Sequence, residues 1–212
     1  MRNDPTLLTP RLVLSVPRDD DRADFRALSG DPRVMRFFPS VQSTEQSDGL
    51  VARCQASFGA HGLGFFTVRR RDDASFVGFV GLSVPSFDAP FMPCVEVGWR
   101  LHVASWGQGY ATEAAREVLR FGFEDHSLRE IVSFTSVENL PSRRLMDRLG
   151  MHRDAAEDFD HPGVSRGHPL ERHVLYRLSH AASCANVDKP LPDSGHDGPG
   201  QRPTPGRPGV TL

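Results

Sequence analysis

The period of the hydrophobic pattern changes across one short loop in the middle of the chain. Residues 95–101 (VEVGWRL) carry an apolar side chain at every second position, which is the period of a β-strand. Residues 109–123 instead repeat small and apolar side chains every three to four positions, as an amphipathic helix does. The sequence therefore predicts a strand, a tight loop and a helix that follow one another directly.

The loop between them, WGQGYAT at residues 106–112, has the composition of an anion-binding site. Its two glycines tolerate positive φ angles and let a ligand approach the backbone closely. The first N–H groups of the following helix have no partner within the helix, and the helix dipole favours negative charge there. Together these features predict a site for a pyrophosphate.

Other interpretations of such a loop compete with this one. A Walker loop requires a lysine after its last glycine, and this stretch has none. A Rossmann fingerprint has a third glycine where this chain has Thr112, and it opens an early βαβ unit rather than following several strands that we expect to be antiparallel. A glycine-rich helix start without a ligand is the alternative that remains when the loop is considered alone.

The rest of the chain predicts one domain over residues 8–180, whose elements surround a single core. The hydrophobic pattern favours strands at 11–16, 64–71, 76–84, 131–137 and 173–178, and helices at 19–28, 43–58 and 139–149. Asn139 is a candidate N-cap of the last helix, and Gly150 is its expected C-terminal stop.

The end of the chain has a different composition. Residues 185–212 contain six prolines and five glycines and almost no bulky apolar side chain. Such a segment cannot bury enough apolar surface to offset the entropy of ordering it, so we expect a disordered tail over residues 181–212.

Charge and composition limit the partners. A net charge of −2 creates no global field for nucleic acid, and no segment predicts a signal peptide or a membrane span. Three cysteines without a CxxC pair favour a reducing compartment, so we expect a cytoplasmic protein, monomeric or homodimeric. The spacing of His161, His168 and His173 fits no standard zinc pattern, and we expect no metal site.

The loop resembles the acetyl-CoA pyrophosphate loop of the GNAT superfamily, Q/R-x-x-G-x-G/A. Gly109 and Ala111 match its last two fixed positions, and Trp106 replaces the usual Gln or Arg, as in the ribosomal-protein N-terminal acetyltransferase (RimJ/RimL-like) branch. Residues 9–14 (TPRLVL), 96–101 (EVGWRL) and 139–151 (NLPSRRLMDRLGM) resemble the same branch in the same order.

This resemblance implies an α+β fold, the GNAT fold, in which a mixed, largely antiparallel sheet has helices on both faces. Two central strands would splay apart, and the pantetheine arm of acetyl-CoA would fill the gap between them. The residues that the resemblance assigns to acetyl-CoA binding are Leu101, His102, Val103, Trp106, Gly107, Gln108, Gly109, Tyr110, Ala111, Thr112 and Asn139.

The resemblance also implies a reaction, the direct attack of a primary amine on acetyl-CoA in a ternary complex. Glu96 would be the general base, although a solvated strand residue or an ion pair with Arg100 is the structural alternative. Ser142 is the candidate for protonating the departing thiolate, although it could simply cap a helix. Met146 stands where many GNAT enzymes have a tyrosine for that step.

The acceptor is expected to be a protein N-terminal α-amine, as in the resembling branch. Two alternatives stay open. One is a small-molecule amine, such as an antibiotic or an aminoacyl conjugate. The other is a non-catalytic acyl-CoA-binding sensor, which Met146 keeps possible because it cannot donate a proton.

Removing residues 185–212 tests the expected tail. Because their composition cannot contribute a core, we expect the melting temperature and the turnover of the truncated protein to stay close to those of the full chain. Thermal unfolding and a steady-state assay of both proteins measure this. A loss of many degrees in the melting temperature would mean that the segment docks on the domain.

Overall fold

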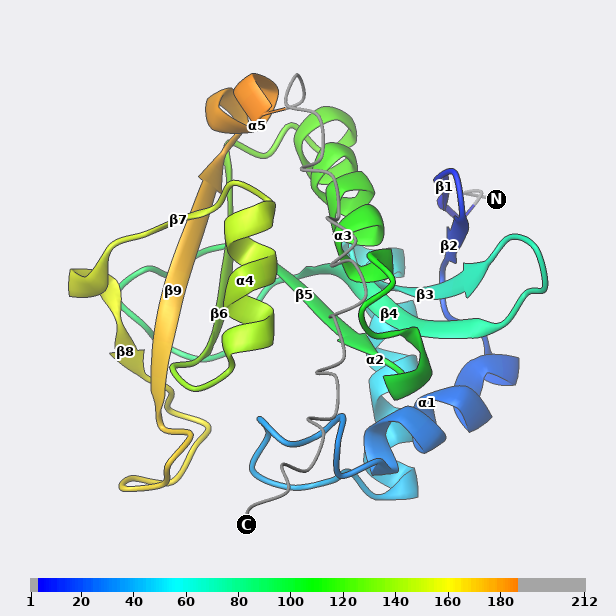
Figure 1. Cartoon of the computed structure of the whole chain (residues 1–212), viewed down its shortest axis with the longest axis horizontal. Helices are drawn as coiled ribbons and strands as arrows, with labels where there is room; N and C mark the ends of the chain where they lie inside the picture. The colour runs from blue at the N-terminus through cyan, green and yellow to red at the C-terminus, as the bar shows by residue number, and fades with distance from the viewer. Residues whose placement is uncertain (1–3, 187–212) are drawn as a thin grey trace, which may run out of the picture.

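The computed structural model describes residues 4–186, and its strands form one continuous sheet (Figure 1). In spatial order the strands are β1 (Thr6–Leu8), β2 (Leu12–Ser15), β3 (Phe65–Arg70), β4 (Phe76–Ser83), β5 (Glu96–Leu101), β6 (Glu130–Ser136), β9 (Arg172–Ser179) and β7 (His152–Arg153). The short strand β8 (Phe159–Asp160) pairs with β9 as well. Among the strands of residues 4–186 only β5 and β6 run parallel, so the sheet is mixed and largely antiparallel, as expected.

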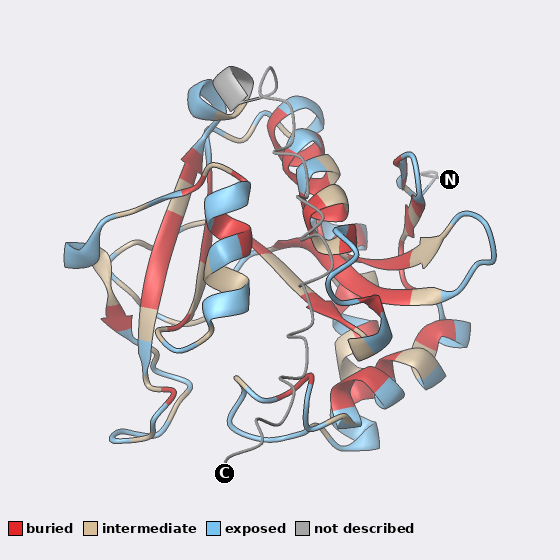
Figure 2. Ribbon diagram, in the orientation of Figure 1, coloured by how far each residue is buried: buried red, intermediate tan, exposed pale blue. Residues whose placement is uncertain are grey.

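Helices cover both faces of this sheet. The helices are α1 (Arg22–Gly30), α2 (Thr44–His61), α3 (Tyr110–Arg120), α4 (Leu140–Arg148) and α5 (His180–Asn186). On one face Phe25 of α1 and Val51 of α2 pack against Phe79 of β4. On the other face α3 and α4 pack on the strands through the largest core cluster. Figure 2 shows buried residues concentrated on the strands and on the helix sides that face them.

Local sequence signals set the helix ends. Ser43 accepts a hydrogen bond from the Gln46 N–H (3.2 Å), and the Gln46 side chain accepts one from the Ser43 N–H (2.8 Å), which is a capping box for α2. Gly62 ends that helix in the left-handed conformation, with φ of 71°. The expected start of α4 is confirmed, because the Asn139 side chain accepts from the Ser142 N–H (3.3 Å).

The strands β5 and β6 meet and then separate. They share the register pair Glu96–Val132, whereas β4 and β5 stay paired along the whole of β5. One residue further on, the Ser133 hydroxyl donates to the Val97 carbonyl (2.9 Å), and beyond that point no backbone pairing continues between them among the described residues. The expected splay of two central strands is therefore confirmed.

The elements that the sequence analysis missed are the shortest ones. The strands β1, β7 and β8 have two or three residues each, too few for a period to be recognised. Residues 181–186, where the disordered tail was expected to begin, belong instead to α5, which follows β9 directly and ends at Asn186. The rest of that expected tail, residues 187–212, lies outside the described residues.

Candidate active site

A cleft of about 2430 Å³ follows the gap between β5 and β6 and opens on both faces of the sheet. The residues 106–112 and α4 line it on the face of α3 and α4. Ser83, Glu96 and the loop between α1 and α2 line it on the opposite face. The cleft therefore brings together the expected cofactor loop and both expected catalytic residues.

The loop before α3 fits a phosphate group. Gly107 and Gly109 have φ angles of 72° and 78°, a region that glycine adopts without strain. Gly109 is the N-cap and offers no side chain to the helix, and the first bond into the loop is from the Glu113 N–H to the Gly109 carbonyl (3.0 Å). The N–H groups of residues 110–112 are therefore left without an intrahelical acceptor, which suits a pyrophosphate.

Several of the other expected cofactor residues use their side chains to fix the loop, and of the expected set His102 and Val103 do not line the cleft. The Trp106 indole, 49% exposed, donates to the Leu101 carbonyl (2.9 Å). The Gln108 amide donates to the Ala104 carbonyl (2.6 Å), and His102 accepts from the Ala104 N–H (3.3 Å). The side chains of Tyr110 and Thr112 are buried, Val103 packs partly against the α1–α2 cluster, and Ala111 against the main core. Their expected contacts are consequently backbone contacts and stay predictions.

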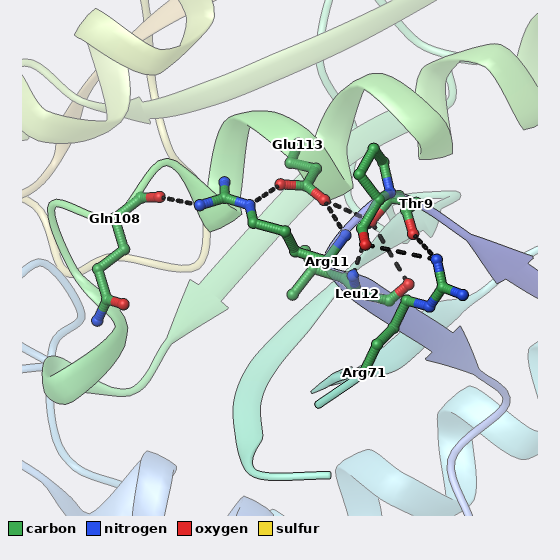
Figure 3. A network of polar contacts seen from close by, with 7 residues as sticks. Thr9, Arg11, Leu12, Arg71, Gln108 and Glu113 are labelled. Carbon is green, nitrogen blue, oxygen red and sulfur yellow. Dashed lines mark hydrogen bonds and ion pairs between the residues drawn. The ribbon is translucent and has the colours of Figure 1, made fainter. Parts of the chain in front are cut away.

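The N-terminal hairpin of β1 and β2 contacts this loop through Arg11 (Figure 3). The Arg11 guanidinium donates through Nε to Glu113 (2.6 Å) and through Nη1 to the Gln108 carbonyl (3.0 Å), and it lies 4.7 Å from the centroid of the Tyr110 ring. Thr9 donates to the same Glu113 carboxylate (2.6 Å). Burial would raise the pKa of Glu113, but the hydrogen bonds from Thr9 and Arg11 outweigh it and lower the pKa.

Sequence reasoning missed this role of Arg11. The motif at residues 9–14 entered only as part of the resemblance. The helical period of residues 109–123 predicts that Glu113 faces away from the small and apolar side of its helix. The structure corrects that placement, because the Glu113 side chain is 15% exposed and faces the hairpin. Arg11 and Glu113 stand 102 positions apart, so no local pattern could have paired them.

Glu96 lies at the point where β5 leaves β6, on the face covered by α1 and α2. Residues opposite each other in an antiparallel pair share a face, and Glu96 is opposite Ser83, whose hydroxyl donates to it (3.2 Å). Burial raises the pKa of Glu96 from 4.5 to about 8, and the Ser83 hydrogen bond opposes this only partly. The alternative of a Glu96–Arg100 ion pair is wrong for the described structure, since Arg100 donates to Ser29 instead (3.1 Å).

Ser142 lies on the other face of the sheet. Trp99 is three positions after Glu96 in β5, so its side chain points to the opposite face of the sheet. Its indole N–H donates to the Ser142 hydroxyl (3.0 Å). That hydroxyl keeps its own proton for another acceptor. Asn139 accepts from the Ser142 N–H and donates to Thr135 (2.8 Å), so its side chain caps α4 whether or not it also contacts pantetheine. Met146 is buried in the core and supplies no group to the cleft.

Aromatic side chains form the far wall on the Glu96 face. Phe134, His161 and His173 line the cleft, and the two histidine rings lie 4.8 Å apart between centroids. Burial lowers the pKa of His161, and it lowers the pKa of His173 to about 4.

Within residues 4–186 no group of three or more His, Cys, Asp or Glu side chains could hold a metal ion. No helix in the same part of the chain is long and apolar enough to cross a membrane.

Comparison with known proteins points to one family. A family model described as "Acetyltransferase (GNAT) domain" matches residues 11–152. An Aspergillus fumigatus protein named FsC-acetyl coenzyme A-N(2)-transacetylase is 32% identical, and the match covers 77% of this chain and 73% of that protein.

Solved structures share the fold. An acetyltransferase from Agrobacterium tumefaciens is 26% identical with a TM-score of 0.67, over 84% of this chain and 96% of that one. RimL, an α-N-acetyltransferase of ribosomal protein L7/L12 in complex with coenzyme A, is 13% identical with a TM-score of 0.68, over 84% of this chain and 99% of that one. The second likeness shows the fold alone.

Replacing Arg11 with glutamine tests whether the hairpin holds the cofactor loop. The change removes the donor to the Gln108 carbonyl and the ion pair with Glu113, so we expect the affinity for acetyl-CoA to fall about tenfold, or about 1.4 kcal/mol. Titration calorimetry measures this. Arg71→Gln is the matched control, because Arg71 donates to the Thr9 carbonyl (3.0 Å) in the same network without touching the loop. An equal loss in both variants would contradict the role of Arg11.

Replacing Glu96 with glutamine tests its buried state through pH. Between pH 4.5 and about 8 the folded wild type holds a proton that the unfolded chain releases, so its stability falls as the pH rises. A pKa unit corresponds to about 1.36 kcal/mol. Because Glu96 is half-buried, we expect a loss of stability below the full value for this pKa shift, roughly 2–4 kcal/mol, and we expect it to be absent in Glu96→Gln.

Urea unfolding at pH 5 and pH 8 measures this difference for wild type and variant. Glu138→Gln is the control, because Glu138 is exposed at the surface and should keep the wild-type pH dependence. Parallel profiles for wild type and Glu96→Gln would mean that the Glu96 carboxyl is solvated like any surface acid.

Proposed function

The chain belongs to the GNAT family of acetyltransferases, and we propose that it moves the acetyl group of acetyl-CoA to the α-amine of a protein or peptide N-terminus. Acetyl-CoA-dependent N-acetylation is the activity of this family, whereas the kind of acceptor is our inference. The observation that carries it is Glu96, a carboxyl with a raised pKa beside the gap between β5 and β6.

We assign the cofactor to the face of α3 and α4. The loop of residues 106–112 would bind the pyrophosphate through free N–H groups, and the gap after Val97 would take the pantetheine arm. The carbonyls of Val95 and Val97 both point toward β6, so the alternation of the strand puts the backbone of Trp99 on the same edge. Those groups, with Leu101, His102, Val103 and Asn139, are the proposed partners of pantetheine.

The proposed reaction uses one residue from each face. The amine nitrogen bonds to the thioester carbon, the proton of the amine passes to Glu96, and the carbon–sulfur bond breaks. The thiolate then takes a proton from Ser142, which regains one from water, or from water directly. Acetyl-CoA supplies the activated acyl group, and the chain supplies orientation and a base.

The pKa of Glu96 favours an α-amine over a lysine. A base of pKa about 8 matches an α-amine of about 7.7–8.0, so the proton passes between them at little cost. A lysine near 10.4 holds its proton more than a hundredfold more tightly. RimL, which shares the fold, is an α-N-acetyltransferase and supports this choice.

A small-molecule acceptor is the second candidate. The Aspergillus fumigatus relative, whose name describes an N(2)-transacetylase of FsC, supports it. The sensor hypothesis is weaker, because Ser142 offers a hydroxyl proton at the cleft even though Met146 does not.

Kinetics of Glu96→Gln test the proposal. With a tetrapeptide bearing a free α-amine, we expect kcat to fall about ten- to a hundredfold, at the low end of general-base catalysis because the α-amine is partly neutral already. The KM for acetyl-CoA should stay near that of wild type, and part of the loss should return at high pH. Release of CoA measured from pH 6 to 9 gives both quantities.

The acceptor class has its own control in that assay. The same peptide with a blocked N-terminus and a lysine side chain should react far more slowly. If only small amines release CoA, the acceptor is a small molecule, and if no amine does while acetyl-CoA binds, the protein is a sensor.

A further inference from the structure

Arg100 is a buried cation without an acidic partner among residues 4–186. Arg100 is only 9% exposed, and its Nη1 group donates to the Ser29 hydroxyl (3.1 Å). The Nε group is buried and has no acceptor, and Nη2 donates to no described residue. By contrast, the partly buried Arg69 pairs with Asp21 (2.8 Å) and Asp24 (2.6 Å).

Aromatic rings only partly compensate this charge. The guanidinium lies 4.3 Å from the centroid of Phe38 and 5.1 Å from that of Phe79. Burial lowers the pKa of Arg100 to about 10, which still leaves the group charged at neutral pH. A desolvated charge is costly unless it is paired, and such unpaired groups are typical of binding sites.

Arg100 shares a row with Glu96 on the face proposed for the acceptor. Glu96, Gly98 and Arg100 alternate along β5 and are opposite Ser83, Gly81 and Phe79 of β4. Gly98 keeps the row open between the two charged residues. A Cβ atom there would stand 3.1 Å from the Phe65 ring and 3.8 Å from Glu96 Oε1.

The loop between α1 and α2 closes the Arg100 end of this row. Arg36 is exposed and lies 5.0 Å from the Phe37 ring, and Arg33 pairs with Asp31 (2.7 Å). Arg33, Arg36 and Phe37 line the cleft, whereas Asp31 does not. The end of the cleft near Arg100 therefore carries an excess of positive charge. Phe38 covers the guanidinium from the loop and is 39% exposed, so its ring can move aside without disturbing the core.

We propose that Arg100 binds a carboxylate of the acceptor, so that the enzyme selects amines bearing a negative charge at a fixed distance. The Nε and Nη2 groups without acceptors form the edge of a guanidinium that binds a carboxylate with two parallel hydrogen bonds. This inference rests on the proposed function, because it takes Glu96 as the place of the attacking amine.

The spacing of the row sets the position of the carboxylate. Four residue-to-residue steps along the strand separate the Cα atoms of Glu96 and Arg100 by about 13 Å. An extended peptide covers about 3.3–3.6 Å per residue. Allowing for the reach of the arginine side chain, the third residue of an acceptor peptide would bring an acidic side chain to Arg100.

A pair of peptides that differ in one charge tests the proposal. For Ala-Ala-Glu-Ala-amide against Ala-Ala-Gln-Ala-amide, we expect the wild type to show a KM at least tenfold lower for the acidic peptide. Arg100→Gln should bring this ratio close to one and leave the KM for acetyl-CoA unchanged. Arg100→Lys, which keeps the charge but not the fork, should retain part of it. A purely structural role of Arg100 would not make the ratio depend on the peptide charge.

The control is Arg53→Gln, which removes the same charge from the exposed side of α2 and should keep the wild-type ratio. A wild-type ratio near one, or a ratio that survives in Arg100→Gln, would overturn the proposal. If neither peptide is acetylated, the α-amine acceptor is wrong instead. In that case 6-aminohexanoate against 6-aminohexanamide puts the same question to a small amine, and an equal KM for both overturns the role of Arg100.

Discussion

The separation of β5 from β6 is the constraint on which the rest of the site depends. These are the only parallel neighbours in the sheet of the described residues, and they hold together through the Glu96–Val132 register and the Ser133–Val97 bond. A sheet that continued beyond that point would leave no room for a ligand between its strands. Because pairing stops there, the cleft passes from one face of the sheet to the other.

The two faces of the sheet then acquire different chemistry. On one face a helix start with free N–H groups and the Ser142 hydroxyl offer hydrogen-bond donors. On the other face two charged side chains, Glu96 and Arg100, lie in a single row. Burial raises the pKa of Glu96, and the buried Nε group of Arg100 has no hydrogen-bond partner. A donor that carries phosphates suits the first face, and an amine that must lose a proton suits the second.

Long-range contacts give the cofactor loop its shape. Gly107 and Gly109 allow the left-handed turns, but a loop with that freedom is not rigid by itself. Arg11 reaches it from the N-terminal hairpin and Trp106 ties it to the end of β5. The loop is thus held from two directions, and Figure 3 shows the first of these contacts, in which Arg11 donates to the Gln108 carbonyl.

The sequence by itself determined the elements that have a period or a cap: the strand at Glu96, the glycine loop, the helix that follows, and the Asn139 cap of α4. Those signals are local, so they survive without knowledge of the fold. Only the tertiary structure decided that Glu113 turns inward to Arg11 and that Arg100 is buried without an acid beside it. Burial and charge pairing depend on which distant segments of the chain meet. The alternating sequence pattern of a strand is the same whether or not another segment covers its polar face.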